Sequence, residues 1–204
     1  MKQNVNKPLW LFSRKFLRTL IKPFLHLFKG FSIAGKENLP KKRASCIIIS
    51  NHAAFADSIY MICAVRPRFT ICGAKSKYFI SSIKRFVFKI ANIIKVVDKN
   101  QFLEDCGKLL ESGEIILVYP EMGRNPDGLG EFKTWAAEVA LSYQVPVIPC
   151  YIYGTTKSHQ GSKRIVFGPP IEPRGNSIEL TNCFRETILR LKPGNKNKNL
   201  VTNR

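Results

Sequence analysis

The sequence predicts an α/β domain in which helices flank a central, largely parallel mixed sheet, with an amphipathic helical element before it. Short apolar runs bounded by turn residues alternate along the chain with segments of helical periodicity, which is typical of parallel strands joined by helices. The 204 residues leave room for one domain with a substantial core.

The first element is a segment at 9–31 that combines Phe and Leu with Lys and Arg. Projection at helical spacing separates a basic arc from an apolar arc, represented by Arg18 and Lys22 on one side and Phe16 and Leu20 on the other. A basic amphipathic helix of this kind suits an anionic membrane interface. Packing of its apolar side on the domain core is the alternative, and both can hold together.

The remaining elements alternate as an α/β fold requires. We expect strands at 46–49, 68–73, 93–97, 114–119, 146–153 and 164–167, and helices at 59–65, 76–90, 101–111, 132–143 and 177–191. The expected domain organisation is a basic amphipathic membrane-association segment at 1–34, the α/β domain at 35–192 and a disordered tail at 193–204.

Charge is the least ordinary property of the composition. Lys and Arg number 33 against 14 Asp and Glu, which gives a net charge of +19 and favours anionic partners such as acidic lipids, phosphorylated substrates, an acidic carrier protein or nucleic acid. The six cysteines have no CxxC spacing, so we expect buried thiols in a reducing compartment and no zinc. No secretory signal is evident, and no apolar run reaches the length of a conventional spanning helix.

His52 and Asp57 form the first candidate site. The strand at 46–49 ends in turn-forming residues, and His52 and Asp57 follow five positions apart. Because helical neighbours lie three or four apart, the two side chains can meet only if the chain turns between them. Asp57 would then orient the imidazole and leave its other nitrogen free as a base. A surface histidine beside a helix-capping aspartate is the structural alternative.

Two further loops follow predicted strands. They are expected at the carboxyl ends of the strands, where functional sites of α/β proteins usually lie. One carries Asp98 and Lys99. The other is dense in turn residues and carries Glu121 and Arg124. Arg124 offers a fork of donors to a phosphate or carboxylate, and Glu121 could bind a hydroxyl or hold Arg124. A structural turn with a surface ion pair is the alternative.

Four stretches, taken in order, resemble motifs of the glycerolipid acyltransferase family, the lysophosphatidate acyltransferase-like enzymes. Asn51, His52 and Asp57 match its NHxxxxD motif. Residues 119–128 (YPEMGRNPDG) resemble FPEGTRSxxG, residues 132–137 (FKTWAA) resemble FKxGA, and residues 145–149 (VPVIP) resemble VPIIPV. Each motif alone is weak, but their order and spacing make the combined match specific.

The resemblance implies transfer of an acyl group from acyl-CoA or acyl carrier protein to a hydroxyl of a lysophospholipid-like acceptor, such as lysophosphatidate. His52 would be the general base and Asp57 would support the imidazolium, so that the acceptor oxygen attacks the thioester without an acyl-enzyme. The residues expected to bind the acceptor are Asn51, Lys99, Glu121, Gly123 and Arg124. No cofactor or metal is implied. The expected location is peripheral or monotopic, on the cytoplasmic face of a membrane with an anionic surface.

Three departures from the family pattern concern the acceptor. Met122 stands where the family has Gly, Trp135 stands where Gly is common, and Lys99 replaces an Arg. We expect Met122 and Trp135 to add bulk near the head group, and therefore an acceptor other than lysophosphatidate or a restricted form of it. A non-catalytic basic module that binds anionic lipid or nucleic acid is the alternative, although no RNP-like, zinc-finger or helix-turn-helix signal supports nucleic-acid binding.

Overall fold

The structure is a computed structural model. It describes residues 30–40, 44–65, 69–75, 92–156 and 161–194, together with Lys15, Phe16, Thr19, Leu20, Lys22, Pro23, Leu25 and Leu27, which are helical. The predicted helix at 76–90 and most of the predicted segment 1–34 and tail 193–204 lie outside the described residues, so these boundaries stay predictions.

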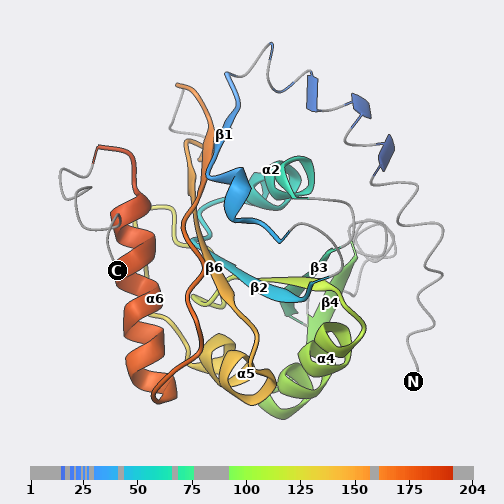
Figure 1. Cartoon of the computed structure of the whole chain (residues 1–204). Coiled ribbons are helices and arrows are strands. Elements are labelled where there is room, and N and C mark those ends of the chain that lie inside the picture. Colours follow the sequence, from blue (N-terminus) through green and yellow to red (C-terminus); the bar gives the residue numbers. More distant parts are fainter. Residues whose placement is uncertain are drawn as a thin grey trace.

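Seven strands of the described chain form one sheet in the order β1-β7-β6-β2-β5-β3-β4 (Figure 1). The strands are β1 (Ser32–Ala34), β2 (Cys46–Ser50), β3 (Phe69–Lys75), β4 (Ile93–Val96), β5 (Ile115–Val118), β6 (Val147–Tyr153) and β7 (Arg164–Phe167). The run from β6 to β4 is parallel, whereas β7 is antiparallel to β6 and parallel to β1. The α/β class with a largely parallel mixed sheet is therefore confirmed.

β2 occupies the middle of the sheet, and every residue of its CIIIS sequence is buried. A strand with neighbours on both sides and helices on both faces needs apolar residues at each position. Ile48 belongs to the core cluster on one face, and Ile47 and Ile49 belong to the cluster on the other. The unbroken apolar run therefore sets β2 at the centre and directs its end toward His52.

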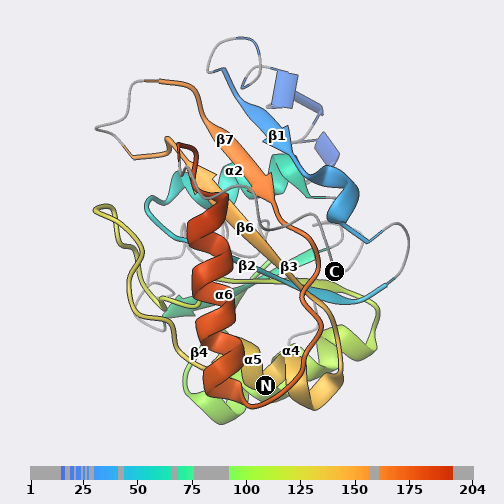
Figure 2. The ribbon, with the colours of Figure 1, turned by 60° about the vertical axis from the view of Figure 1, so that its left-hand side comes forward.

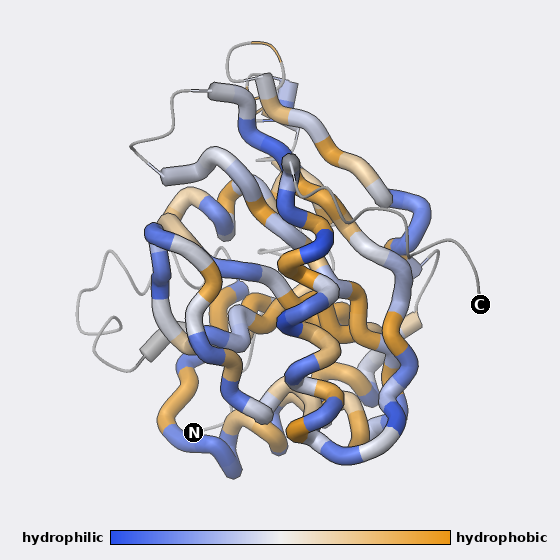
Figure 3. Tube along the Cα trace, turned by 90° about the vertical axis from the view of Figure 1, so that its left-hand side faces the viewer, coloured by the Kyte–Doolittle hydropathy of each residue, from blue (hydrophilic) through white to orange (hydrophobic). Residues whose placement is uncertain are grey.

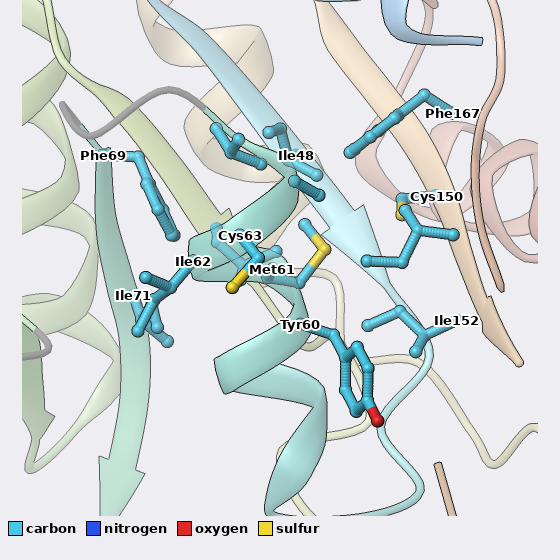
Figure 4. Close-up of a cluster of buried hydrophobic side chains, with 14 of the residues drawn as sticks. Ile48, Tyr60, Met61, Ile62, Cys63, Phe69, Ile71, Cys150, Ile152 and Phe167 are labelled. Atoms are coloured by element: carbon cyan, nitrogen blue, oxygen red, sulfur yellow. The ribbon is translucent and has the colours of Figure 1, made fainter. Parts of the chain in front are cut away.

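Among the described helices, one covers one face of the sheet and three cover the other. α2 (Ala56–Ala64) lies on one face, and α4 (Lys99–Glu111), α5 (Trp135–Tyr143) and α6 (Ser177–Leu191) lie on the other (Figures 1 and 2). On the α2 side, Met61 and Ile62 pack among Ile48, Phe69 and Ile71 (Figure 4). The sheet is thus the middle layer of three.

α6 shows how a helix in an outer layer is patterned. Leu180, Phe184 and Ile188 are buried at intervals of four, which places them on one face of the helix. Figure 3 shows hydrophilic and hydrophobic residues alternating along this helix. Asn176 caps it by accepting from the N–H groups of Ile178 (3.0 Å) and Glu179 (2.9 Å). Within the described chain, no helix has both the length and the apolar character to span a bilayer.

Two short elements at one edge of the sheet were not expected. β1 pairs with β7, and the 3-10 helix η1 (Lys36–Asn38) follows it after Gly35. Gly35 turns the chain between them at φ 68°, and a Cβ there would lie 1.9 Å from the carbonyl oxygen of Phe167. Three residues carry too little periodicity to reveal a strand whose partner is far away in the sequence.

Asn51 joins the end of β2 to β6. Its Nδ2 donates to the carbonyl of Ile152 (2.9 Å), and its Oδ1 accepts from the N–H of the same residue (2.7 Å). The side chain is buried at 4% exposure. Asn51 therefore satisfies the backbone hydrogen bonds of Ile152 in β6, just beyond the carboxyl end of β2.

We expect Asn51→Ala to lower the free energy of unfolding by about 2–4 kcal/mol, because it leaves a buried N–H and C=O of Ile152 without partners. Urea denaturation measures the change. Asn176→Ala is the matched control and should cost about 1 kcal/mol, the usual value for an exposed cap. Equal losses in the two variants would contradict a joining role for Asn51.

Candidate active site

His52 and Asp57 meet across a turn. His52 follows β2, and Asp57 lies in the first turn of α2, where its N–H donates to the carbonyl of Ala54 (3.1 Å). His52 Nδ1 lies 2.9 Å from Asp57 Oδ2. The Asp57 side chain is fully buried, and the His52 side chain is 18% exposed. The spacing of five thus brings the two together as expected, with the imidazole accessible at the surface.

The Asp57 carboxylate is held by donors on both oxygens. Oδ2 accepts from the N–H groups of Ala53 (2.7 Å) and Ala54 (2.9 Å) as well as from His52, and Oδ1 accepts from the hydroxyl of Thr155. A carboxylate oxygen only accepts, so Nδ1 of His52 carries the proton. In the neutral imidazole, Nε2 is then the nitrogen that can take a proton.

Thr155 and Tyr119 belong to the site although sequence analysis assigned neither a role. Thr155 follows β6 after Gly154, which turns the chain at φ 80°. The Tyr119 ring follows β5 and stacks on the imidazole of His52, with centroids 4.0 Å apart and 15° between planes. Both residues follow strands that neighbour β2 in the sheet. Their positions at the ends of predicted strands are the sequence feature that could have indicated a role in the site.

Glu121 connects the second loop to the histidine. Its Oε1 accepts from the N–H of His52 (2.9 Å), and its Oε2 accepts from the N–H of Gly130 (2.7 Å). Burial raises the pKa of the Glu121 carboxyl, while these two N–H groups act in the opposite direction. Glu121 makes no ion pair with Arg124, so its observed contacts fix the loop beside His52 and do not hold the guanidinium.

Gly123 and Arg124 are exposed on this loop, next to Asn125, whose N–H donates to the carbonyl of His52 (2.7 Å). A Cβ at Gly123 would meet only the carbonyl oxygen of Glu121, at 4.0 Å. The structure therefore places an exposed guanidinium and open backbone close to the His52 segment. An anionic group could be bound there by the guanidinium fork.

Met122 and Trp135, which we expected to add bulk near the head group, both pack against the core cluster on the α4–α5 face. Met122 has φ 52°, the left-handed region that favours glycine, and its side chain packs against the core cluster on the α4–α5 face. The Trp135 ring packs on Phe102 of α4, with centroids 5.5 Å apart. Both side chains are thus partly buried against the core, and the expected restriction of the acceptor stays a prediction.

Lys99 lies at the start of α4, away from the histidine. Its Nζ pairs with Glu138 Oε2 of α5 at 2.8 Å. β4, which precedes it, is three strands from β2 in the sheet order, or about 14 Å at the usual strand spacing. Asp98 caps α4 by accepting from the N–H of Gln101 (2.9 Å). The structure brings together His52, Asp57 and Glu121, places Gly123 and Arg124 beside them, and leaves Lys99 outside this group.

Comparison with known proteins identifies the family. The model of the acyltransferase family matches residues 30–153. Curated relatives include a chloroplastic 1-acyl-sn-glycerol-3-phosphate acyltransferase of Brassica napus, 27% identical over 72% of this chain, and a 1-acyl-sn-glycerol-3-phosphate acyltransferase of Chlamydomonas reinhardtii, 27% identical over 79%. The chain spans about half the length of both, 46% and 52%.

A solved structure agrees in fold. The 1-acyl-sn-glycerophosphate acyltransferase of Thermotoga maritima superposes with a TM-score of 0.70 at 23% identity, covering 87% of this chain and 77% of that one. The matched family model includes the segments that carry His52, Asp57 and Glu121. This chain therefore belongs to the acyltransferase family.

Proposed function

We propose that this protein transfers a fatty acyl group from a thioester, acyl-CoA or acyl carrier protein, to a hydroxyl of a lysophospholipid-like acceptor. The observation that carries the proposal is the contact of His52 Nδ1 with the fully buried carboxylate of Asp57, at 2.9 Å. The pair leaves Nε2 able to act as a base, and the family match supports acyl transfer as the reaction.

The reaction follows from this pair. His52 Nε2 takes the proton of the acceptor hydroxyl while the acceptor oxygen attacks the thioester carbonyl. A C–O bond forms, the C–S bond breaks, and the imidazolium returns its proton to the departing sulfur. Asp57 accepts a hydrogen bond from Nδ1–H of His52 throughout the reaction and stabilises the imidazolium. No acyl-enzyme is needed, because the acceptor attacks directly.

The loop residues take different roles in this proposal. Arg124 binds the anionic head group of the acceptor, and the absence of a side chain at Gly123 leaves space for that group beside the backbone. Glu121 positions the loop through its two N–H contacts. Asn51, whose amide is engaged by Ile152, supports the strand end and does not bind the acceptor. Lys99 stays a predicted second cation, which would have to leave Glu138 to bind.

His52→Ala should lower the turnover number by about 10²- to 10⁴-fold, the range usual for loss of a general base. Asp57→Asn should cost less than His52→Ala but still more than about tenfold, because the neutral amide neither holds the imidazole in the same tautomer nor stabilises its positive charge. Turnover is followed by mass analysis of products from a mixed lysolipid extract with labelled acyl-thioesters. Asp105→Asn serves as the control. Near-wild-type rates in either site variant would contradict the mechanism.

Arg124→Ala should weaken acceptor binding by about 1.5–3 kcal/mol, the value of a hydrogen bond to a charged group, and should raise the acceptor KM accordingly. Steady-state kinetics with lysophosphatidate measure the change. Arg174→Ala removes the same charge from an exposed position near the start of α6 and should leave KM unchanged. Unchanged KM in Arg124→Ala would remove this residue from the head-group site.

We also propose that the protein binds an anionic membrane surface peripherally, on the cytoplasmic face. Phe16, Leu20 and Leu27 of the first segment are 57%, 57% and 78% exposed, whereas Leu25 and Phe31 are buried in the core. These described residues therefore include apolar side chains that face outward and others that pack in the core of the domain. Phe55, just before α2 and between His52 and Asp57 in the sequence, is also exposed at 55%.

Replacing Phe16, Leu20 and Leu27 together by Ser should reduce binding to anionic vesicles at least about tenfold, because it removes apolar area that would enter the interface. Co-sedimentation at low and high salt measures binding. This triple change keeps Leu25 and Phe31 and thus the core. Ile178→Ser, at an exposed apolar position on α6, is the control. Undiminished binding would place the membrane contact elsewhere.

A further inference from the structure

The aromatic ring beside the histidine has a fixed place in the sheet. β5 pairs with β2 in parallel, with Val118 opposite Ile49, and Tyr119 is the next residue. Tyr119 is 6% exposed and contributes to the core cluster under α2. Its ring and the His52 imidazole are nearly parallel, 15° apart, with centroids at 4.0 Å. The imidazole is therefore held at its edge by Asp57 and on its face by Tyr119.

The two contacts act in different directions on the same ring. Asp57 lies in the plane of the imidazole, where it accepts the Nδ1 proton. Tyr119 lies on the face, where an aromatic ring presents its negative quadrupole to a cation. When His52 takes the proton of the acceptor, positive charge spreads over the whole imidazole. The face contact is then stronger than in the neutral ring, which is the condition for lowering a barrier.

The Tyr119 hydroxyl is turned to a different partner. It lies 3.4 Å from the hydroxyl of Ser58 in α2. Burial, and secondarily the nearby charge of Asp57, raise the pKa of the Tyr119 phenol, so it stays neutral at the pH of the reaction. A neutral, buried phenol supplies no charge of its own to the imidazolium. The contribution to His52 therefore comes from the ring face and not from the oxygen.

We propose that Tyr119 is a positioning residue that fixes the plane of the His52 imidazole and stabilises the imidazolium formed during acyl transfer. Among the described residues, two carboxyl groups bond to His52: Asp57 of α2 accepts from the imidazole, and Glu121 of the loop after β5 accepts from the backbone N–H. The stabilising part of the inference rests on the proposed function of His52 as a base. The positioning part rests on the stack alone.

The first test examines the stack without any substrate. The chain has three histidines, so His52→Ala identifies the His52 signals in an NMR spectrum of the full chain. In the parent protein and in Tyr119→Phe, the His52 ring protons should show the shielding of a stacked ring, and the Nδ1 proton bonded to Asp57 should be visible at low field. In Tyr119→Leu, both signatures should be lost. Unchanged His52 signals in Tyr119→Leu would overturn the positioning role.

The second test separates charge from shape. Phenylalanine and its di- and trifluorinated analogues at position 119 keep the ring in place while fluorine weakens its quadrupole. The turnover number should fall stepwise along this series at constant acceptor KM. Tyr119→Leu should lose about 3- to 30-fold relative to Tyr119→Phe, as expected for a cation–π contact. Equal turnover along the fluorinated series would overturn the stabilising role and leave a ring that acts by shape alone.

Two controls keep the outcomes separate. Ser58→Ala removes the partner of the Tyr119 hydroxyl without touching the ring and should stay within about twofold of the parent turnover. Thermal melting checks that Tyr119→Leu is folded, and the fluorinated series is available if it is not. If no variant and not even the parent protein transfers acyl groups, the proposed function fails. The NMR signatures then still decide whether Tyr119 positions His52.

Discussion

A carboxylate that is cut off from water must find its hydrogen bonds inside the protein, and the edge of the sheet around Asp57 is built to provide them. The carboxylate oxygens of Asp57 accept hydrogen bonds from two backbone N–H groups of the preceding turn, from the imidazole of His52 and from the hydroxyl of Thr155. Without these donors, burial of the charge would be strongly unfavourable. The turn after β2, the start of α2 and the end of β6 are therefore tied to one side chain.

The parallel order of the sheet makes this convergence possible. β6 and β5 lie on either side of β2, so the segments that follow all three strands emerge at one edge. From there, β2 supplies His52, β5 supplies Tyr119 and Glu121, and β6 supplies Thr155. Asn51 reinforces the arrangement by bonding to both backbone groups of Ile152. The site joins residues far apart in the sequence, such as Asp57 and Thr155, which are 98 positions apart, yet each is placed by a neighbouring strand.

Local patterns predicted much of this molecule. The residues of β7 and α6 agree with the predicted strand at 164–167 and helix at 177–191, because apolar periodicity and a capping residue mark them. The meeting of His52 and Asp57 followed from their spacing and the turn residues before them. The two secondary-structure elements and the His52–Asp57 contact each depend on residues close together in the chain, so side-chain periodicity and turn residues are enough to predict them.

Contacts between distant strands were beyond the reach of such patterns. Thr155 and Tyr119 contact Asp57 and His52 only because β6 and β5 flank β2, and apolar runs do not reveal strand order. The packing of Trp135 on Phe102 was not predicted, and it arises because α4 and α5 lie side by side. Lys99 pairs with Glu138 for the same reason. The partner of a long side chain at a helix surface depends on which helices pack together, and the sequence pattern does not predict that packing.

The bridge made by Glu121 has a consequence for the energetics of recognition. By accepting from His52 at one oxygen and Gly130 at the other, one carboxylate closes a stretch of irregular chain into a ring without any regular secondary structure. Such a segment has already lost much of its conformational freedom before a ligand arrives. Less entropy is then surrendered at the moment of association, and more of the contact energy appears as affinity.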